Sequence, residues 1–155
     1  MSAPAPDVPE GFAPLFRTSP FLEATGPFFH RPLAQGFTVG LRVSPRHTNA
    51  SGTLHGGLIA TLADVSLGYV TATSRTPALR MVTASLGIDY VGAAQVGDWV
   101  EAQVSVVKAG GKLAFAGALI TACSASVTRP VASARAVFLV AEPSADPARA
   151  AAPPA

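Results

Sequence analysis

Cysteine and charge are both scarce in this 155-residue sequence. A single cysteine, Cys123, excludes an intrachain disulfide framework, as expected for the reducing cytoplasm. Charged residues make up 13% of the chain and apolar residues 49%, a low charge content for a fully solvated surface. No apolar run approaches the roughly 18–20 residues of a membrane-spanning helix. We therefore expect an oligomer that buries surface between subunits, and no membrane contact.

A strong net charge is also missing. The formal net charge is +2, and the basic residues are scattered, which argues against a nucleic-acid partner. The N-terminus has no basic region followed by an apolar run, so it does not resemble a signal peptide, and we expect a cytoplasmic protein. Nine of the eleven basic residues are Arg and alanine is abundant, a composition that hints at a GC-rich bacterial genome.

Several catalytic motifs are absent. His30, His47 and His55 lack metal-ligand spacing, so we expect no metal. The segment 110–112 reads Gly-Gly-Lys without the spacing of a phosphate-binding loop. There is no Gly-x-Ser-x-Gly elbow, which argues against an α/β-hydrolase.

The chain reads as one domain between two tails. Residues 1–14 and 142–155 are rich in Pro and Ala and are predicted to be disordered, leaving a domain over 15–141. Three prolines interrupt 15–33, which predicts a short helical turn and then irregular chain. Apolar periodicity predicts a strand, a helix and four strands, which lie at 36–44, 56–74, 81–91, twice within 96–126 around a turn at 109–111, and at 131–140. This is an α+β protein with one antiparallel sheet and one long helix.

The predicted helix has two unlike faces. One is an apolar stripe expected to pack on the sheet, formed by Leu58, Leu62, Val65 and Tyr69. The opposite face has small residues, namely Gly57, Thr61, Asp64 and Gly68, with Ala60 and Thr71 beside them. Small residues allow another surface to approach closely, and Asp64 is the only charge among them. Gly56 and Gly57 in the first turn expose N–H groups that can bind an oxyanion or a polarised carbonyl.

The segment HTNASGTLHGGLIATLAD, residues 47–64, resembles the hotdog-fold acyl-CoA thioesterases, in particular the phenylacetate-pathway (PaaI-like) branch. The matching residues are Asn49, Gly52, His55-Gly56-Gly57 and Asp64. A looser likeness covers about residues 26–140. The resemblance implies a long central helix wrapped by a curved antiparallel sheet of about five strands, assembled as a homodimer or a dimer of dimers. It also implies an acyl-CoA substrate and no separate cofactor, because coenzyme A is part of the substrate.

The resemblance also implies a role for each matched position. The Gly56 N–H and the Asn49 side chain would polarise the thioester carbonyl, and Asp64 would activate water or attack directly. A hydroxyl in the next strand assists in some members, and that position is Thr83 here. His55 would shape the loop or contact the leaving group. The sequence departs from the family at Thr83, which is Ser in other members, at Ala93, which is often Pro, and in a slightly longer loop before Thr83.

Spacing places a constraint on this site. Gly56 and Asp64 are eight residues apart, which corresponds to about 12 Å along a helix. An N–H and a carboxylate at that separation do not readily act on one carbon. If two helices pair antiparallel across a two-fold axis, the start of one lies near the middle of the other. The expected site is therefore shared between subunits.

Other candidates are weaker. Gly57 is a further substrate-binding candidate, and Lys108, Lys112 and Arg80 are candidates for CoA phosphates, although the two lysines also suit a solvated hairpin. Asp98 lies in a turn and is expected to be structural. Thr83 and Asp89 are expected on the strand face opposite the apolar residues. Plausible acyl-pocket residues, equally explained by core packing, are Phe28, Phe29, Leu58, Leu62 and Tyr90.

The sequence thus favours an acyl-CoA thioesterase. Two alternatives remain. A hotdog-fold enoyl-CoA hydratase or dehydratase would need a His paired with an acid over the acyl Cα–Cβ bond. A non-catalytic acyl-CoA-binding module would not need Asp64.

Overall fold

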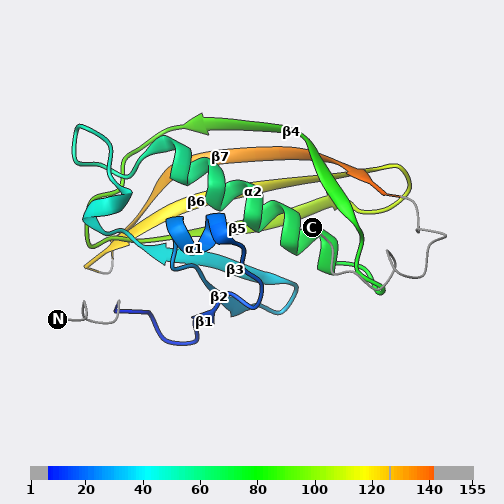
Figure 1. Ribbon diagram of the computed structural model, residues 1–155, viewed down its shortest axis with the longest axis horizontal. Coiled ribbons are helices and arrows are strands. Elements are labelled where there is room, and N and C mark those ends of the chain that lie inside the picture. The colour runs from blue at the N-terminus through cyan, green and yellow to red at the C-terminus, as the bar shows by residue number, and fades with distance from the viewer. Residues whose placement is uncertain (1–6, 126, 142–155) are drawn as a thin grey trace.

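A curved antiparallel sheet wraps around one long helix (Figure 1). The computed structural model describes residues 7–125 and 127–141. The helices are α1 (Pro20–Thr25) and α2 (Gly56–Thr73), with a short 3-10 turn at Pro45–His47. The strands are β1 (Ala13–Pro14), β2 (Phe29–Pro32), β3 (Phe37–Arg42), β4 (Met81–Tyr90), β5 (Trp99–Lys108), β6 (Leu113–Ser124) and β7 (Val127–Val140).

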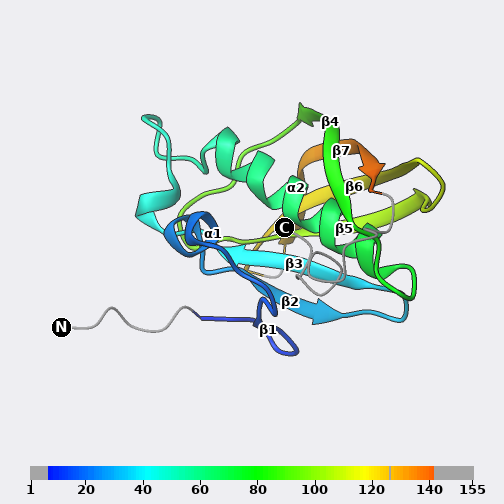
Figure 2. The same cartoon turned by 45° about the vertical axis from the view of Figure 1, so that its right-hand side comes forward.

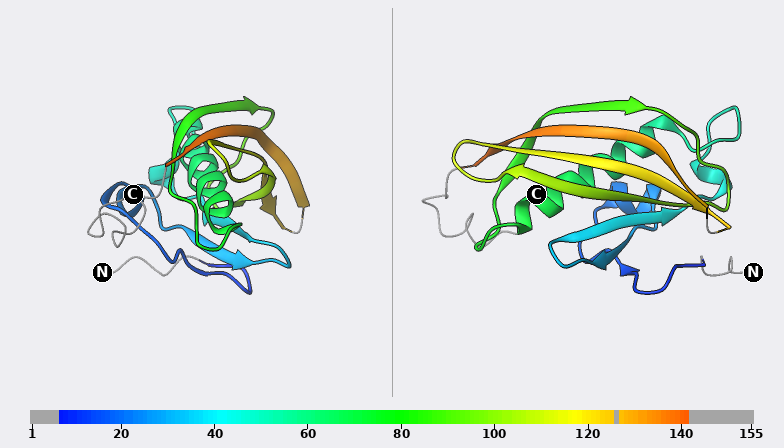
Figure 3. Two further views of the ribbon diagram at one scale, coloured as in Figure 1. Left: turned by 90° about the vertical axis from the view of Figure 1, so that its right-hand side faces the viewer. Right: turned by 180° about the vertical axis from the view of Figure 1, so that it is seen from behind.

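The seven strands follow the order β1-β2-β3-β5-β6-β7-β4, and every neighbouring pair is antiparallel. β1 and β4 therefore lie at opposite edges of the sheet (Figure 2). Seen along its axis, α2 lies inside the curve of the sheet (Figure 3). No described helix is long and apolar enough to cross a membrane.

Alanine on the inner face of the sheet lets α2 pack closely. Ala114, Ala116, Ala134 and Ala136 on β6 and β7 are all buried beneath the helix. Their small side chains leave room for larger helix residues such as Leu62, which is fully buried. The alternation of buried and exposed residues along β6 is that of a strand with one face on the core.

The buried face of α2 is wider than the stripe predicted from its periodicity. Its buried residues are Leu58, Ile59, Leu62, Ala63, Ser66, Leu67, Val70 and Thr71. Val65 and Tyr69 are only partly buried, and Thr71, expected beside the small-residue face, is fully buried. The reason is that the sheet curves around the helix and covers more than one side of it.

The N-terminal region contains more structure than its prolines predicted. The short helical turn exists as α1, capped by the Ser19 side chain, which accepts a hydrogen bond from the Leu22 N–H. β1 and β2 raise the strand number from about five to seven. Part of the segment 1–14, expected to be a tail, is thus ordered, because Ala13–Pro14 pairs with β2 and the Phe12 ring packs on Trp99. Residues 1–6 and the predicted tail over 142–155 lie outside the described residues.

Candidate active site

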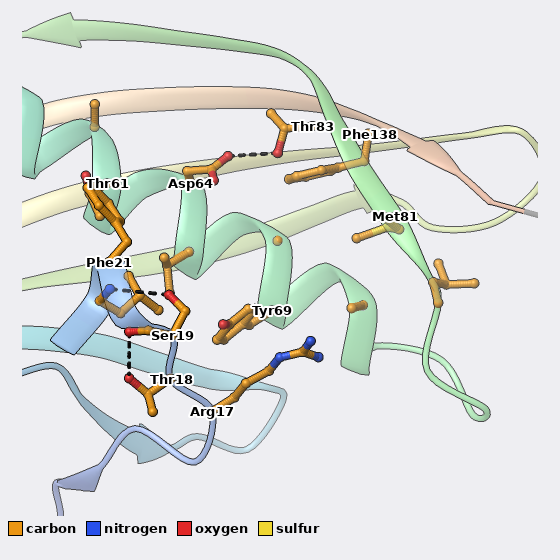
Figure 4. Close-up of a pocket in the computed structure, with 16 residues that line it drawn as sticks. Arg17, Thr18, Ser19, Phe21, Thr61, Asp64, Tyr69, Met81, Thr83 and Phe138 are labelled. Atoms are coloured by element: carbon orange, nitrogen blue, oxygen red, sulfur yellow. Dashed lines mark hydrogen bonds between the residues drawn. The ribbon is translucent and has the colours of Figure 1, made fainter. Parts of the chain in front are cut away.

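Asp64 on α2 is hydrogen-bonded to Thr83 on β4 (Figure 4). The Thr83 hydroxyl donates to Asp64 Oδ1 over 2.8 Å. In the single chain Asp64 is half-buried and Thr83 is exposed at the sheet edge. The structure thus brings together the acid and the hydroxyl that the sequence suggested for catalysis.

The hydrogen bond between Thr83 and Asp64 depends on a bulge in β4. Thr83 pairs with Phe138 and Ser85 pairs with Val137, so Ala84 is an extra residue between them. A bulge of this kind reverses which face later side chains occupy. The expectation that Thr83 and Asp89 share a face is therefore wrong. Thr83 faces the helix, whereas Asp89 lies on the outer face and pairs with Arg135 at 3.3 Å.

Asp64 and Thr83 line a cavity of about 680 Å³. Small residues of α2, Thr61 and Gly68 among them, form part of its wall. The rest comes from the chain before α1, α1 itself, the loop before β4, β4 and β7. The larger side chains are Arg17, Phe21, Leu22, Val65, Tyr69, Leu79, Met81 and Phe138.

Most residues expected to form the acyl pocket lie elsewhere. Phe28, Phe29 and Leu62 are buried in the core and do not line this cavity. Phe21 and Phe138 line it instead. The helix residues of the wall could be found from the spacing around Asp64, but the sequence has no signal that brings the segment before α1 or β7 to that helix face.

Among the described residues that line this cavity, Arg17 and Asp64 are the only charged ones. Tyr69 lies near both. Its ring is 5.9 Å from the Arg17 guanidinium carbon. Burial raises the pKa of Tyr69, the Arg17 charge lowers it, and the Asp64 charge raises it. The phenol of Tyr69 is therefore a hydrogen-bond donor throughout the neutral pH range.

The start of α2 is a second cluster of functional candidates. His55 caps the helix, with Nδ1 accepting the Gly57 N–H at 2.9 Å. The Gly56 carbonyl accepts the Tyr90 hydroxyl at 2.9 Å. A Cβ at Gly57 would lie 3.0 Å from His55 Nδ1, so glycine permits this tight cap. Among the described residues none accepts the Gly56 N–H, so this donor is available to a ligand.

Asn49 is held by its own loop. Its Oδ1 accepts N–H groups of Ser51 and Thr53 at 2.9 and 3.3 Å, and its Nδ2 donates to Thr53 Oγ1 at 2.9 Å. An amide nitrogen carries two hydrogens, so one N–H of Asn49 is left for a ligand.

A second cavity, of about 420 Å³, lies beside His55 and Gly57. Phe21 and Thr61 line both this cavity and the one at Asp64.

The two clusters are separate within one chain. Gly56 and Asp64 belong to one uninterrupted helix, so they are about 12 Å apart along its axis. Of the weaker candidates, Lys108 and Lys112 lie on either side of the turn between β5 and β6, and Arg80 directly precedes β4. None of these three residues lines the Asp64 cavity. Asp98 accepts the Gln95 N–H and pairs with Arg129, as expected of a structural acid. The described residues contain no group of three His, Cys, Asp or Glu side chains that could hold a metal.

Comparison with known proteins identifies the family. A family model described as the thioesterase superfamily matches residues 51–124. A Pseudomonas aeruginosa protein, provisionally named an esterase, is 52% identical over 133 residues, which cover 85% of this chain and 96% of that protein. The chain belongs to the thioesterase superfamily. Human acyl-coenzyme A thioesterase 13 is 39% identical over 83 residues, or 52% of this chain and 57% of its own length.

Solved structures confirm the hotdog fold of this thioesterase. Zebrafish thioesterase superfamily member 2 has 29% identity and a TM-score of 0.66, covering 74% of this chain and 81% of its own. The Escherichia coli PaaI protein of the phenylacetic acid degradation operon shares the fold, with 21% identity, a TM-score of 0.69, and coverage of 80% and 86%. The resemblance that the segment 47–64 indicated is thereby confirmed.

Proposed function

We propose that this thioesterase hydrolyses an acyl-CoA to the free acid and coenzyme A. The observation that carries the proposal is the Asp64 carboxylate, which faces a cavity while Thr83 holds one of its oxygens. Family membership supports the reaction, and the relative named acyl-coenzyme A thioesterase 13 supports a CoA ester as substrate. Thioester hydrolysis needs a base or nucleophile and a group that stabilises the oxyanion.

Asp64 is the base in this proposal. The Thr83 hydroxyl occupies Oδ1, so Oδ2 accepts the proton of the attacking water. The water oxygen bonds to the carbonyl carbon, and the C=O electron pair moves to the carbonyl oxygen. When that pair returns, the C–S bond breaks and the coenzyme A thiolate leaves and takes up a proton. Direct attack by Asp64, through an anhydride that water opens, would use the same residues.

The oxyanion donors come from a second subunit. We place the Gly56 N–H and the Asn49 amide of one subunit opposite Asp64 of the partner subunit, because one chain holds them about 12 Å apart along the helix. The edge strand β4 supports this arrangement. It carries Thr83 and Tyr90 and ends beside Val91, and the last two are 53% and 62% exposed in the single chain. A partner docked along β4 would cover both clusters in a homodimer, alone or within a dimer of dimers.

The remaining candidates have supporting roles. His55 and Gly57 shape the helix start beside the leaving group through their 2.9 Å hydrogen bond. Lys108, Lys112 and Arg80 are candidates for the CoA phosphates. The single cysteine supports a cytoplasmic location, and the Pseudomonas relative supports a bacterial source.

A hydratase is the alternative reaction. It needs a histidine beside the acid; none of the described residues lining the Asp64 cavity of one chain is a histidine, so only the partner subunit's His55 could take that role. The test is thiol release from a panel of acyl-CoAs, run beside the absorbance of an enoyl-CoA. We expect free thiol from saturated acyl-CoAs. Hydration of the enoyl-CoA without thiol release, or binding with neither reaction, would contradict the proposal.

A further inference from the structure

Arg17 places in the cavity a positive charge that is not paired with any described carboxylate. Its side chain is half-buried and lines the same wall as Tyr69. Among the described residues no carboxylate forms an ion pair with it, whereas Arg31, Arg42, Arg129 and Arg135 all have one. Its guanidinium carbon lies 5.9 Å from the centre of the Tyr69 ring. A guanidinium in this setting is suited to an anionic ligand group.

The two charges of the cavity lie apart. Figure 4 shows the Arg17 guanidinium beside Tyr69, away from the Asp64–Thr83 pair. Tyr69 follows Asp64 by five residues on α2, a rise of about 7.5 Å along the helix. The other described residues of the wall are uncharged, and Val65 and Gly68 lie between Asp64 and Tyr69 on α2. A ligand that reaches from Asp64 to Arg17 must therefore have an apolar middle.

We propose that the acyl group hydrolysed here carries a carboxylate at its far end, which Arg17 binds while Asp64 acts on the thioester. The inference deepens the proposed function and depends on it. The thioester lies next to Asp64, the methylene chain runs along Gly68, and the distal carboxylate meets the guanidinium and the Tyr69 hydroxyl. The substrate class is a dicarboxylic acyl-CoA, and Arg17 is its specificity-determining residue.

Another anion could meet Arg17. Coenzyme A carries phosphates, and a guanidinium binds phosphate as well as carboxylate. The two sources differ in their dependence on the acyl group. A phosphate contact would be shared by every acyl-CoA, whereas a contact with the acyl carboxylate is made only by dicarboxylic substrates.

The experiment compares kcat/KM for matched substrates. Glutaryl-, adipyl- and suberyl-CoA are each assayed against the acyl-CoA in which an isopropyl group replaces the distal carboxylate. These pairs differ in charge but have similar size and length. The enzymes are the wild type, Arg17→Met, Arg17→Lys and Tyr69→Phe. Arg135→Met is the control, because Arg135 is exposed on the outer face of the sheet.

We expect the wild type to favour at least one dicarboxylic substrate over its isopropyl counterpart. Arg17→Met should lower that preference about ten- to hundredfold, as loss of a charged hydrogen bond does, with kcat/KM for the isopropyl substrates retained. Arg17→Lys should restore part of the preference, Tyr69→Phe should reduce it less than Arg17→Met, and Arg135→Met should match the wild type.

Results that contradict the inference differ from those that contradict the proposed function. An equal loss for both substrates of each pair in Arg17→Met would assign Arg17 to a CoA phosphate and overturn the inference. Hydrolysis by the wild type without any preference for the carboxylate would overturn it while leaving the proposed function intact. If the wild type hydrolyses none of the acyl-CoAs, the proposed function itself is overturned. Circular dichroism of each variant excludes misfolding as the cause of a loss.

Discussion

The Thr83 hydroxyl donates a 2.8 Å hydrogen bond to Asp64, across 19 residues of sequence and from a strand to a helix. This contact fixes Oδ1, and Oδ2 is the oxygen that accepts a proton from water in the mechanism we propose. The pair therefore gives the acid an orientation as well as a position.

Asp64→Asn should lower kcat by about a hundredfold or more, because the amide keeps the size of the side chain but loses its basicity. Binding of acyl-CoA, measured by calorimetry, should persist. Asp89→Asn is the matched control, since Asp89 pairs with Arg135 on the outer face of the sheet. Turnover close to wild type in Asp64→Asn would exclude this acid as the base.

Thr83→Val should lower kcat about tenfold, the effect expected from losing one hydrogen bond to a charged group, with KM nearly unchanged. Thr83→Ser keeps the hydroxyl and should retain most of the activity. Steady-state kinetics of both variants, with thermal denaturation as a check of folding, would test this. A loss of activity in Thr83→Ser, with Thr83→Val close to wild type, would show that the methyl group, and not the hydrogen bond, matters.

A mixed dimer should recover activity if the site is shared between subunits. Asn49→Ala and Asp64→Asn are each expected to be nearly inactive as homodimers. In a mixed dimer one site would combine wild-type Asn49 with wild-type Asp64, and the other would carry both substitutions. Co-expression with two different tags and purification through both should yield about half of wild-type activity, by two-fold symmetry. No recovery would place each complete site within one chain.

Stability should decrease as the pH falls below the ordinary pKa of histidine. His47 is buried, and burial lowers its pKa from the ordinary value of 6.5. Below pH 6.5 the unfolded chain therefore binds a proton that the folded chain does not, so the free energy of unfolding falls with pH. Its Nδ1 accepts the Ser44 N–H at 3.1 Å, a bond that also requires the unprotonated nitrogen.

Urea unfolding between about pH 5 and 7.5 would measure this effect above the carboxylate range. His47→Asn can accept the same N–H and should lose most of the pH dependence. His30→Asn, a substitution of a partly exposed histidine, should retain it. An unchanged pH dependence in His47→Asn would assign the effect to another group.

Thr71→Val should stabilise the fold by about 1 kcal/mol. Thr71 is fully buried, and its hydroxyl has no hydrogen-bond partner among the described residues. A methyl group of similar size removes the cost of that unsatisfied hydroxyl. Thr73→Val, at an exposed position of the same helix, should change the free energy of unfolding by less than about 0.5 kcal/mol. Destabilisation by Thr71→Val in urea unfolding would show that its hydroxyl is satisfied.

The sequence by itself was sufficient for the helix, for the five longer strands and for the residues of the thioesterase motif. These features are local. Apolar periodicity marks α2 and β3 to β7, and the segment 47–64 contains Asn49, His55, Gly56 and Asp64 at their family spacing. The N-terminal strands escaped prediction because β1 and β2 are two and four residues long, too short for alternation to be recognised.

Only the tertiary structure decided which side chains face Asp64. Thr83 reaches it because of a bulge whose position depends on pairing with β7, and strict alternation would have turned it to the outer face. Arg17, Phe21 and Phe138 join the same cavity from segments far apart in the sequence. Such contacts depend on how the sheet curves around α2 and where the chain before α1 crosses it. Local periodicity has no information about either, because both result from packing between distant segments.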